Sequence, residues 1–118
     1  YSFEQLALHH IRQIKQKLGI SGVQSDICGW KGDGAQIDLL IDRRDQTINL
    51  CEMKFSHGEF EITKQYDERL RERAEIFRSA TKTRKALHQT FVTTYGLKKN
   101  MYSGNVQSEV VLDDLFVE

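Results

Sequence analysis

Three residues have types and spacing that suit chemistry on a phosphate group: Asp38, Glu52 and Lys54. If the segments around them form a hairpin centred on Asp45, Asp38 lies opposite Glu52, with Cβ atoms about 5 Å apart. Lys54 is two residues beyond Glu52, so it lies on the same face of its strand. Two carboxylates this close repel each other, and a divalent cation relieves the repulsion better than one ammonium group does. This set is typical of metal-dependent phosphodiester hydrolysis, in which the lysine orients water or neutralises developing charge.

The apolar setting of the two acids favours this interpretation. Asp38 and Glu52 each stand between two apolar residues, and charged residues are rarely buried in such strands without a partner. The alternative is a surface salt bridge between Lys54 and either acid, worth about 0–1 kcal/mol. Spacing alone leaves both interpretations open.

The elements that must position these residues are predicted from hydrophobic periodicity. Apolar residues at helical spacing predict helices over 3–18 and 63–81. Alternating or β-branched segments predict strands over 21–30, 37–42, 47–54, 91–95 and 106–112. Turns are predicted at 31–34 and 44–46. The order α-β-β-β-α-β-β predicts an α/β domain, with a mixed β-sheet flanked by helices.

Composition narrows the class of protein. The 118 residues suffice for a single domain, 1–118, and a hydrophobic fraction of 39% excludes a disordered chain. Seventeen Lys and Arg balance seventeen Asp and Glu, which argues against a purely electrostatic nucleic-acid binder. No apolar run approaches about 18 residues, so no membrane partner is expected. Cys28 and Cys51 lie in apolar segments without metal-ligand spacing, and we expect reduced core thiols in a cytoplasmic protein.

Two segments carry a family resemblance. Gly34–Ile41 and Leu50–Lys54 resemble the PD-(D/E)XK nuclease superfamily, and the element order agrees with its restriction-endonuclease-like core. Together with residues 3–5, 93–96 and 113–116, these two segments are similar to the C-terminal domain of certain bacterial proteins. In those proteins an AAA-type ATPase lies upstream. We therefore expect a piece of a longer chain. Because the sequence has no GxxxxGK[ST] loop, ATP would be bound outside it.

The resemblance implies roles for particular residues. Asp38 and Glu52 would bind Mg²⁺ or Mn²⁺, and Lys54 would be the catalytic lysine. Many members also place a glutamate on the first helix, and Glu4 is the matching candidate for a third metal ligand; its alternative role is a favourable interaction with the helix dipole. Lys64 or Gln65 would match a polar residue that some members carry on the next helix. Ile37 replaces the proline of the superfamily name, at a position that is apolar in many members.

Basic residues supply candidates for contact with DNA phosphates. On or just after the second long helix these are Arg69, Arg71, Arg73, Arg78, Lys82, Arg84 and Lys85, and the loop at 98–100 is a second candidate. The preferred candidates are Arg71, Arg78, Lys82, Lys98 and Lys99. Acidic residues are interleaved with the helical ones, so a solvated, salt-bridged face is the alternative.

Three functional hypotheses follow from these features. The first is a metal-dependent nuclease domain that acts on DNA, with an upstream ATPase domain of the same polypeptide as its partner. The second is a DNA-binding or regulatory module of that ATPase, with the same fold and no cleavage. The third is a structural domain that forms a homo-oligomer through the acidic C-terminal end and the basic helix.

Overall fold

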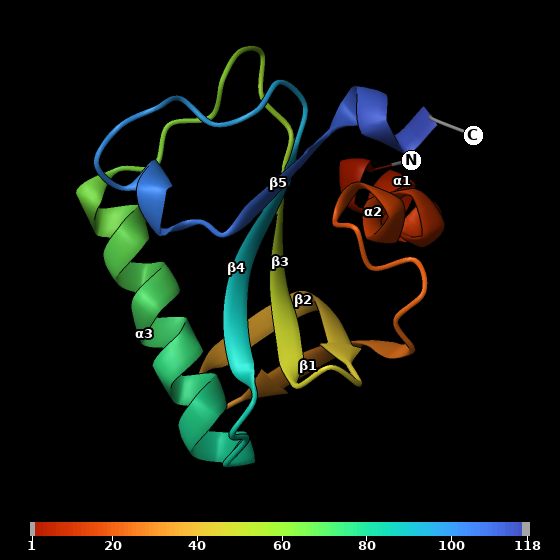
Figure 1. Ribbon diagram of the computed structural model, residues 1–118. Helices are drawn as coiled ribbons and strands as arrows, with labels where there is room; N and C mark the ends of the chain where they lie inside the picture. The colour runs from red at the N-terminus through yellow and green to blue at the C-terminus, as the bar shows by residue number, and fades with distance from the viewer. Residues whose placement is uncertain (1, 117–118) are drawn as a thin grey trace.

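A five-stranded mixed sheet forms the centre of the computed structural model, which describes residues 2–116 (Figure 1). The strands are β1 (Ser25–Gly32), β2 (Ala35–Arg43), β3 (Thr47–Lys54), β4 (Ala86–Thr93) and β5 (Ser108–Val111), in the spatial order β1-β2-β3-β4-β5. β1, β2 and β3 pair antiparallel, whereas β4 is parallel to β3 and β5 is parallel to β4. The helices are α1 (Phe3–Leu8), α2 (Ile11–Lys17) and α3 (Lys64–Thr81), with short 3₁₀ helices η1 (Ser103–Asn105) and η2 (Leu112–Phe116). The predicted α/β class, a mixed sheet flanked by helices, is confirmed.

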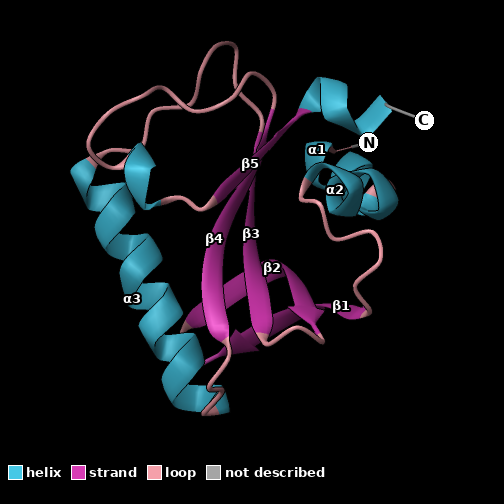
Figure 2. Ribbon diagram, viewed as in Figure 1, coloured by secondary structure: helices cyan, strands magenta, loops and turns pink. Residues whose placement is uncertain are grey.

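The helices cover both faces of the sheet (Figure 2). On one face, α1, α2 and η2 pack on a core that includes Ile14, Leu39 and Cys51. On the other face, α3 packs through Phe77 on a core that includes Leu50. Neighbouring residues of β3 thus point to opposite helical layers, as the pleat of a strand requires. None of the helices within residues 2–116 is long and apolar enough to cross a membrane.

The turn between β1 and β2 is tight and was predicted correctly. Gly32 pairs with Ala35, so only Asp33 and Gly34 form the connection. Both residues have a positive φ, 52° and 82°. Two positive φ values in succession are the requirement of a type I′ turn, which suits the twist of a hairpin.

A β-bulge interrupts β2 at Asp38. The register of β1 against β2 shifts by one residue between Cys28 and Trp30, so Gly29 faces both Asp38 and Leu39. A Cβ atom at Gly29 would lie 3.3 Å from the carbonyl oxygen of Asp38, which only glycine avoids. Because a bulge re-aims the side chains beside it, Asp38 leaves the regular alternation of its strand.

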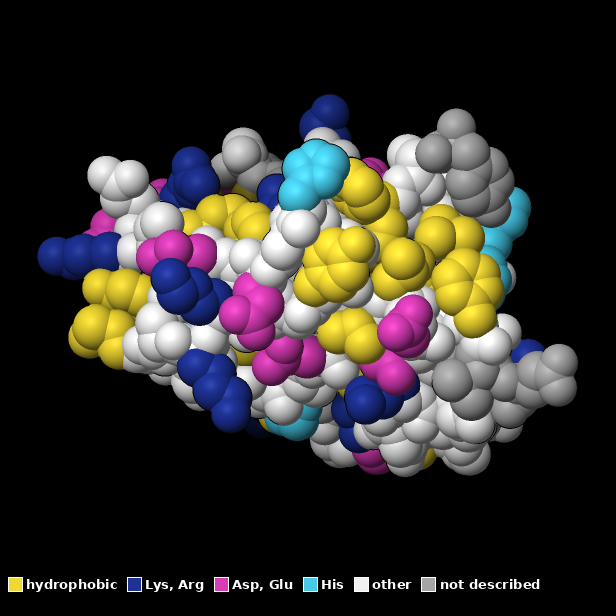
Figure 3. All heavy atoms as spheres, turned by 90° about the horizontal axis from the view of Figure 1, so that it is seen from above, with side chains coloured by type: hydrophobic (Ala, Val, Ile, Leu, Met, Phe, Trp, Pro, Cys, Tyr) yellow, Lys and Arg dark blue, Asp and Glu magenta, His cyan; other side chains and the backbone are white. Residues whose placement is uncertain are grey.

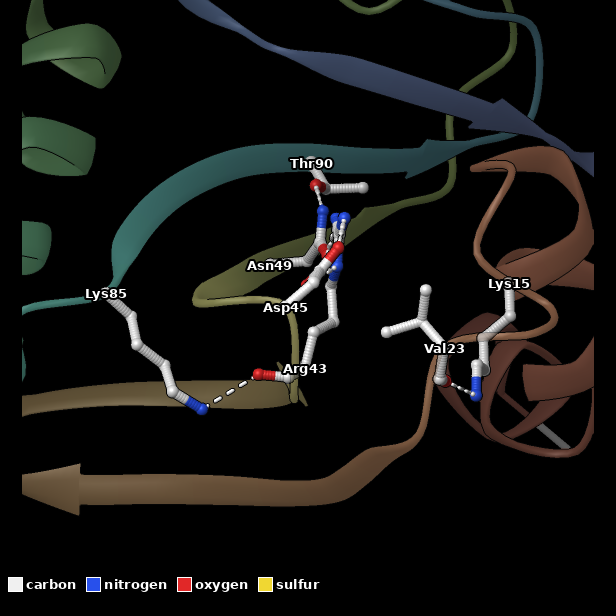
Figure 4. A network of polar contacts seen from close by, with 7 residues as sticks. All are labelled: Lys15, Val23, Arg43, Asp45, Asn49, Lys85 and Thr90. Carbon is white, nitrogen blue, oxygen red and sulfur yellow. Dashed lines mark hydrogen bonds and ion pairs between the residues drawn. The ribbon is translucent and has the colours of Figure 1, made fainter.

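Hydrogen bonds of polar side chains connect the β2–β3 hairpin to β4 and to the residue before it (Figure 4). Arg43 donates to both carboxylate oxygens of Asp45, at 2.9 and 2.6 Å, and to Asn49 Oδ1 at 3.1 Å. Asn49 Nδ2 donates to Thr90 Oγ1 at 2.9 Å, and Lys85 Nζ donates to the carbonyl oxygen of Arg43 at 2.8 Å. A slip of one residue would break these bonds and turn the apolar side chains to the wrong face, so the register is strongly specified.

α3 has the boundaries that the apolar stripe predicts. The hydroxyl of Thr63 caps its first turn by accepting a hydrogen bond from the backbone N–H of Tyr66, at 3.1 Å. The last residue of the helix is Thr81, and Lys82 follows as its C-cap with a left-handed φ of 57°. Arg78 donates to two carbonyl oxygens just beyond that end, at 2.9 and 3.1 Å. This long, well-capped helix supplies one wall of the candidate site.

The single first helix predicted over 3–18 is wrong, because the chain forms α1 and α2 in its place. His10 has φ −123° and ψ 35°, outside the helical region, and its ring Nδ1 lies 2.7 Å from the carbonyl oxygen of Leu6. That oxygen would accept the backbone N–H of residue 10 in a continuous helix, whereas here this N–H bonds to Ala7. A side chain inserted into the hydrogen-bond ladder is a recognised cause of a helix break. Both Ala7 and Ile14 are then fully buried.

Three predicted strands have shifted boundaries. β1 begins at Ser25 rather than at residue 21, β4 runs over Ala86–Thr93 rather than 91–95, and β5 is limited to Ser108–Val111. β4 extends over polar residues because it pairs with the whole length of β3, from Ala86 opposite Thr47 to Thr93 opposite Lys54. Pairing between distant segments therefore overrides local composition.

The two cysteines have different surroundings. Cys51 is 1% exposed in the core, as predicted, and both cysteines are free thiols. The prediction that Cys28 is a core thiol is wrong, because its side chain is exposed. β1 is an edge strand, and most of its residues face solvent.

Candidate active site

The register of β2 against β3 agrees with the hairpin predicted from the sequence. Leu40 pairs with Leu50, and the ladder ends one residue short of Asp38 and Glu52. The last pair is Leu39 with Cys51, and the bulge in β2 begins at the next residue. The register thus brings the two acids to the same end of the hairpin without pairing them.

A cavity of about 510 Å³ lies between α3 and this end of the sheet. Glu52 and Lys54 of β3 line it, as predicted for two residues on one face of a strand. The opposite wall comes from α3 and contributes Tyr66, Arg69 and Arg73. The structure therefore combines the Glu-x-Lys segment with an aromatic ring and two guanidinium groups.

Asp38 lies beside this cavity and not in its lining. Its side chain is exposed and borders a separate hollow of about 290 Å³ with Trp30 and Lys31. Gln36 borders both hollows, and its Nε2 donates to Asp38 Oδ1 at 2.8 Å. The bulge accounts for this difference, since it takes Asp38 out of the strand's alternation.

Glu52 is held by two side chains of α3. The hydroxyl of Tyr66 donates to Glu52 Oε2 at 2.8 Å, and Arg73 Nη1 lies 3.3 Å from the same oxygen. The side chains of Glu52 and Arg73 are each 17% exposed, so the ion pair is largely shielded from water. Glu52 Oε1 has no partner within residues 2–116.

Tyr66 is a permanent donor at this site. Burial, and then the negative charge of Glu52, raise the pKa of Tyr66 far above its ordinary value. The phenol therefore keeps its proton at every physiological pH. It directs that proton at the carboxylate and orients it.

Lys54 and Arg69 both approach the Tyr66 ring. Lys54 Nζ lies 5.4 Å and Arg69 Cζ lies 5.3 Å from the ring centroid, within the range of a cation–π contact. Neither cation forms an ion pair within residues 2–116. The alternative interpretation of Lys54, a salt bridge to Asp38 or Glu52, does not describe the structure.

Arg73 is incompletely satisfied. Its Nη1 lies 3.5 Å from the carbonyl oxygen of Gln36, but its Nε and Nη2 are buried without a hydrogen-bond partner within residues 2–116. A buried donor without a partner costs about 1–3 kcal/mol. Such a group calls for an explanation, and an acceptor that binds there is one.

Asp38 and Glu52, the two predicted ligands of Mg²⁺ or Mn²⁺, border different hollows at this end of the sheet. Asp38 and Glu52 each keep one carboxylate oxygen without a partner in the described part of the chain. Mg²⁺ is often bound by one or two carboxylates and completes its shell with water and phosphate oxygens. Within residues 2–116 no group of three or more His, Cys, Asp or Glu could hold a metal ion. The predicted ligands thus amount to two carboxylates in neighbouring hollows, which do not form a closed cage.

The other candidates from the resemblance lie elsewhere. Glu4 is exposed on α1, which packs on the sheet face opposite α3, so the structure does not bring it to the cavity. Lys64 and Gln65 are exposed on the first turn of α3 and do not line the cavity. Their predicted roles stay predictions.

The basic residues predicted for DNA contact are scattered. Arg71 pairs with the buried Asp67 at 3.1 Å, and Arg78 bonds to the backbone beyond α3. Lys98 lies 3.8 Å from Glu61. The exposed Lys82 and Lys99, like the other three, lie outside the cavity lining.

Sequence reasoning named Arg69 and Arg73 only among seven basic residues that could contact phosphates, and it missed Tyr66; it did not place the three in one site. Their spacing of three and four residues is a usable signal, since it places them on one face of α3. This face could have been compared with the β3 face that carries Glu52.

A further surface lies at the end of the molecule formed by the loops after β3 and β4. Phe55, directly after Lys54, is 63% exposed, and its ring packs near Phe3 and His57, with centroids 6.1 and 5.7 Å apart. Viewed from above, apolar side chains gather there among charges of both signs (Figure 3). His57 belongs to this surface and does not line the cavity.

Comparison with known proteins adds no family assignment: no family model and no curated protein matches the chain.

Proposed function

We propose that the domain is a metal-dependent nuclease that hydrolyses phosphodiester bonds in DNA, with a restriction-endonuclease-like core. One observation carries this proposal: Glu52 and Lys54 line a cavity rich in cations, and Asp38 lies on the neighbouring strand, one residue beyond the end of the β2–β3 ladder. The resemblance of the same residues to the PD-(D/E)XK superfamily supports it, and suggests an upstream ATPase domain as partner.

Each residue has a chemical role in this proposal. Glu52, with Asp38 from the neighbouring hollow, would hold Mg²⁺ or Mn²⁺, which would lower the pKa of bound water and stabilise charge on a phosphate. Lys54 carries no carboxylate partner in the described part of the chain, so its ammonium group is available to orient the attacking water and to neutralise the developing negative charge. Tyr66 orients the Glu52 carboxylate through its hydroxyl.

The test is nicking of supercoiled plasmid in the presence of Mn²⁺. We expect the wild type to nick the plasmid and Glu52→Gln to lose activity by at least about a hundredfold, because an amide is a poor metal ligand and carries no charge. Glu68→Gln is the matched control, since Glu68 is exposed on α3 and makes no contact with the cavity. Absence of nicking by the wild type, or equal nicking by Glu52→Gln, would overturn the proposal.

A second candidate is a DNA-binding or regulatory module that does not cleave. The observation in its favour is that the carboxylate of Glu52 is already engaged by Tyr66 and Arg73. Under this alternative the wild type binds DNA in EDTA, takes up no Mn²⁺ in calorimetric titration, and leaves the plasmid intact. Heat of Mn²⁺ binding that disappears in Glu52→Gln would exclude it.

A further inference from the structure

Arg73 has more hydrogen-bonding capacity than the protein uses. A guanidinium group offers five N–H donors in a planar fork. Within residues 2–116 the contacts of Arg73 are made through Nη1 alone, to Glu52 Oε2 at 3.3 Å and to the Gln36 carbonyl oxygen at 3.5 Å. Nε and Nη2 are shielded from solvent and have no partner among these residues, and they form the side of the fork that would bind two oxygens of one anion.

Two more cations lie at the same cavity. Lys54 and Arg69 flank the ring of Tyr66 and have no ion-pair partner within residues 2–116. The carboxylates that line the cavity are Glu52, which is already paired, and Glu72, which is exposed. The cations therefore outnumber the acids, and the cavity favours a negatively charged ligand.

The chemistry of these donors points to a phosphate group. Phosphate offers several acceptor oxygens to a forked guanidinium, and arginine is the residue best suited to bind it with two parallel hydrogen bonds. The volume of about 510 Å³ admits a fragment larger than a single anion. A phosphate of a DNA strand satisfies both the charge and the space.

We infer that Arg73, Arg69 and Lys54 bind a backbone phosphate of DNA, and that this phosphate takes Arg73 away from Glu52. This inference rests on the proposed function, because it concerns the same cavity. Nε and Nη2 are shielded from solvent while Nη1 contacts Glu52, so a phosphate reaches that side of the fork only when the guanidinium turns. The Glu52–Arg73 ion pair therefore belongs to the free domain and opens when DNA binds. The phosphate contacts thus come from the α3 face that lines the cavity, and not from Arg71, Arg78 or Lys82.

Binding is measured without cleavage, by the fluorescence anisotropy of a short labelled DNA strand in EDTA. We expect Arg69→Gln to weaken binding about tenfold and to lower the salt dependence by about one phosphate contact. Arg84→Gln is the matched control, because Arg84 is exposed and outside the cavity lining. Equal affinities of these two variants would overturn the inference.

The exchange of Arg73 between Glu52 and DNA predicts the direction in which a substitution of Glu52 changes DNA affinity. Glu52→Gln keeps the shape of the side chain and releases Arg73, so we expect it to tighten DNA binding at least about fivefold more than Glu72→Gln does. Both variants remove one negative charge from the same cavity, which makes Glu72→Gln the control for charge alone. Equal tightening by the two variants, or weaker binding by Glu52→Gln, would refute the exchange.

Free inorganic phosphate offers the same acceptor oxygens as a phosphate of DNA and is the alternative ligand of the cavity. Inorganic phosphate, added as a competitor, should displace the strand only at concentrations far above the DNA dissociation constant. Displacement at comparable concentrations would assign the cavity to a free anion and overturn the DNA inference. Because all these measurements are made in EDTA, their outcome is independent of plasmid nicking: the proposed activity can fail while the phosphate site stands, and the reverse.

Discussion

The hydroxyl of Tyr66 connects α3 to β3, and its removal gives a quantitative test of the site. In Tyr66→Phe the ring keeps its packing against Phe60 and Phe91, with centroids 5.4 and 6.2 Å away, and only the donor to Glu52 is lost. A hydrogen bond to a charged acceptor contributes about 1.5–3 kcal/mol. Since Arg73 still contacts the same carboxylate oxygen, we expect the free energy of unfolding to fall by about 1.5 kcal/mol, the lower end of this range.

Urea denaturation followed by circular dichroism measures this loss as a lower midpoint with an unchanged slope. Tyr95→Phe is the control, because Tyr95 is 61% exposed and its hydroxyl has no partner within residues 2–116, so its effect should stay below about 0.5 kcal/mol. In a Glu52→Gln background the acceptor is neutral, and the cost of Tyr66→Phe should fall to about 1 kcal/mol. Equal stability of Tyr66→Phe and the wild type would refute the contact.

The same residue predicts a dependence on pH. Because the pKa of Tyr66 is raised in the folded domain, the folded state keeps a proton that the unfolded chain loses above its usual value of about 10. The contribution of Tyr66 to stability is therefore complete below that pH and declines as the pH rises further. Tyr66→Phe should lack this part of the alkaline decline, and an identical pH profile for both proteins would contradict the assignment.

Two further predictions concern the core and the thiols. Phe77→Ala should lower the free energy of unfolding by about 3–5 kcal/mol in urea denaturation, because Phe77 is 3% exposed and packs edge-on against Trp30; a loss below about 1 kcal/mol would mean that α3 does not cover this face. In the folded protein, Ellman's reagent should titrate one thiol, Cys28, and reach Cys51 only after unfolding, since burial raises the pKa of Cys51 to about 12. Partial burial, and then the charge of Asp42, raise the pKa of Cys28 as well. Its reaction should therefore be slower than that of a free cysteine and should accelerate with rising pH. Two fast thiols would contradict the structure.

The local sequence pattern was sufficient to predict the part of the site that lies on the β2–β3 hairpin. The register that pairs Leu40 with Leu50 and brings Asp38 and Glu52 to the same end of the hairpin follows from strand alternation and from a short polar turn at Asp45, both of which are readable in the sequence. The amphipathic stripe of α3 was equally readable. The α/β class and the burial of Cys51 follow from the same periodicity.

Tertiary structure alone decided which side chains meet. Periodicity gives the buried face of each element, but not which helix covers which sheet face, so it could not reveal that Arg73 and Tyr66 hold Glu52. The bulge opposite Gly29 turns Asp38 aside through a contact between distant backbone segments. The break at His10 and the exposure of Cys28 likewise depend on packing and on the edge position of β1. Composition and spacing thus determined the chemical groups and the strand that carries them, whereas long-range packing determined their partners, because contacts between distant segments leave no period in the sequence.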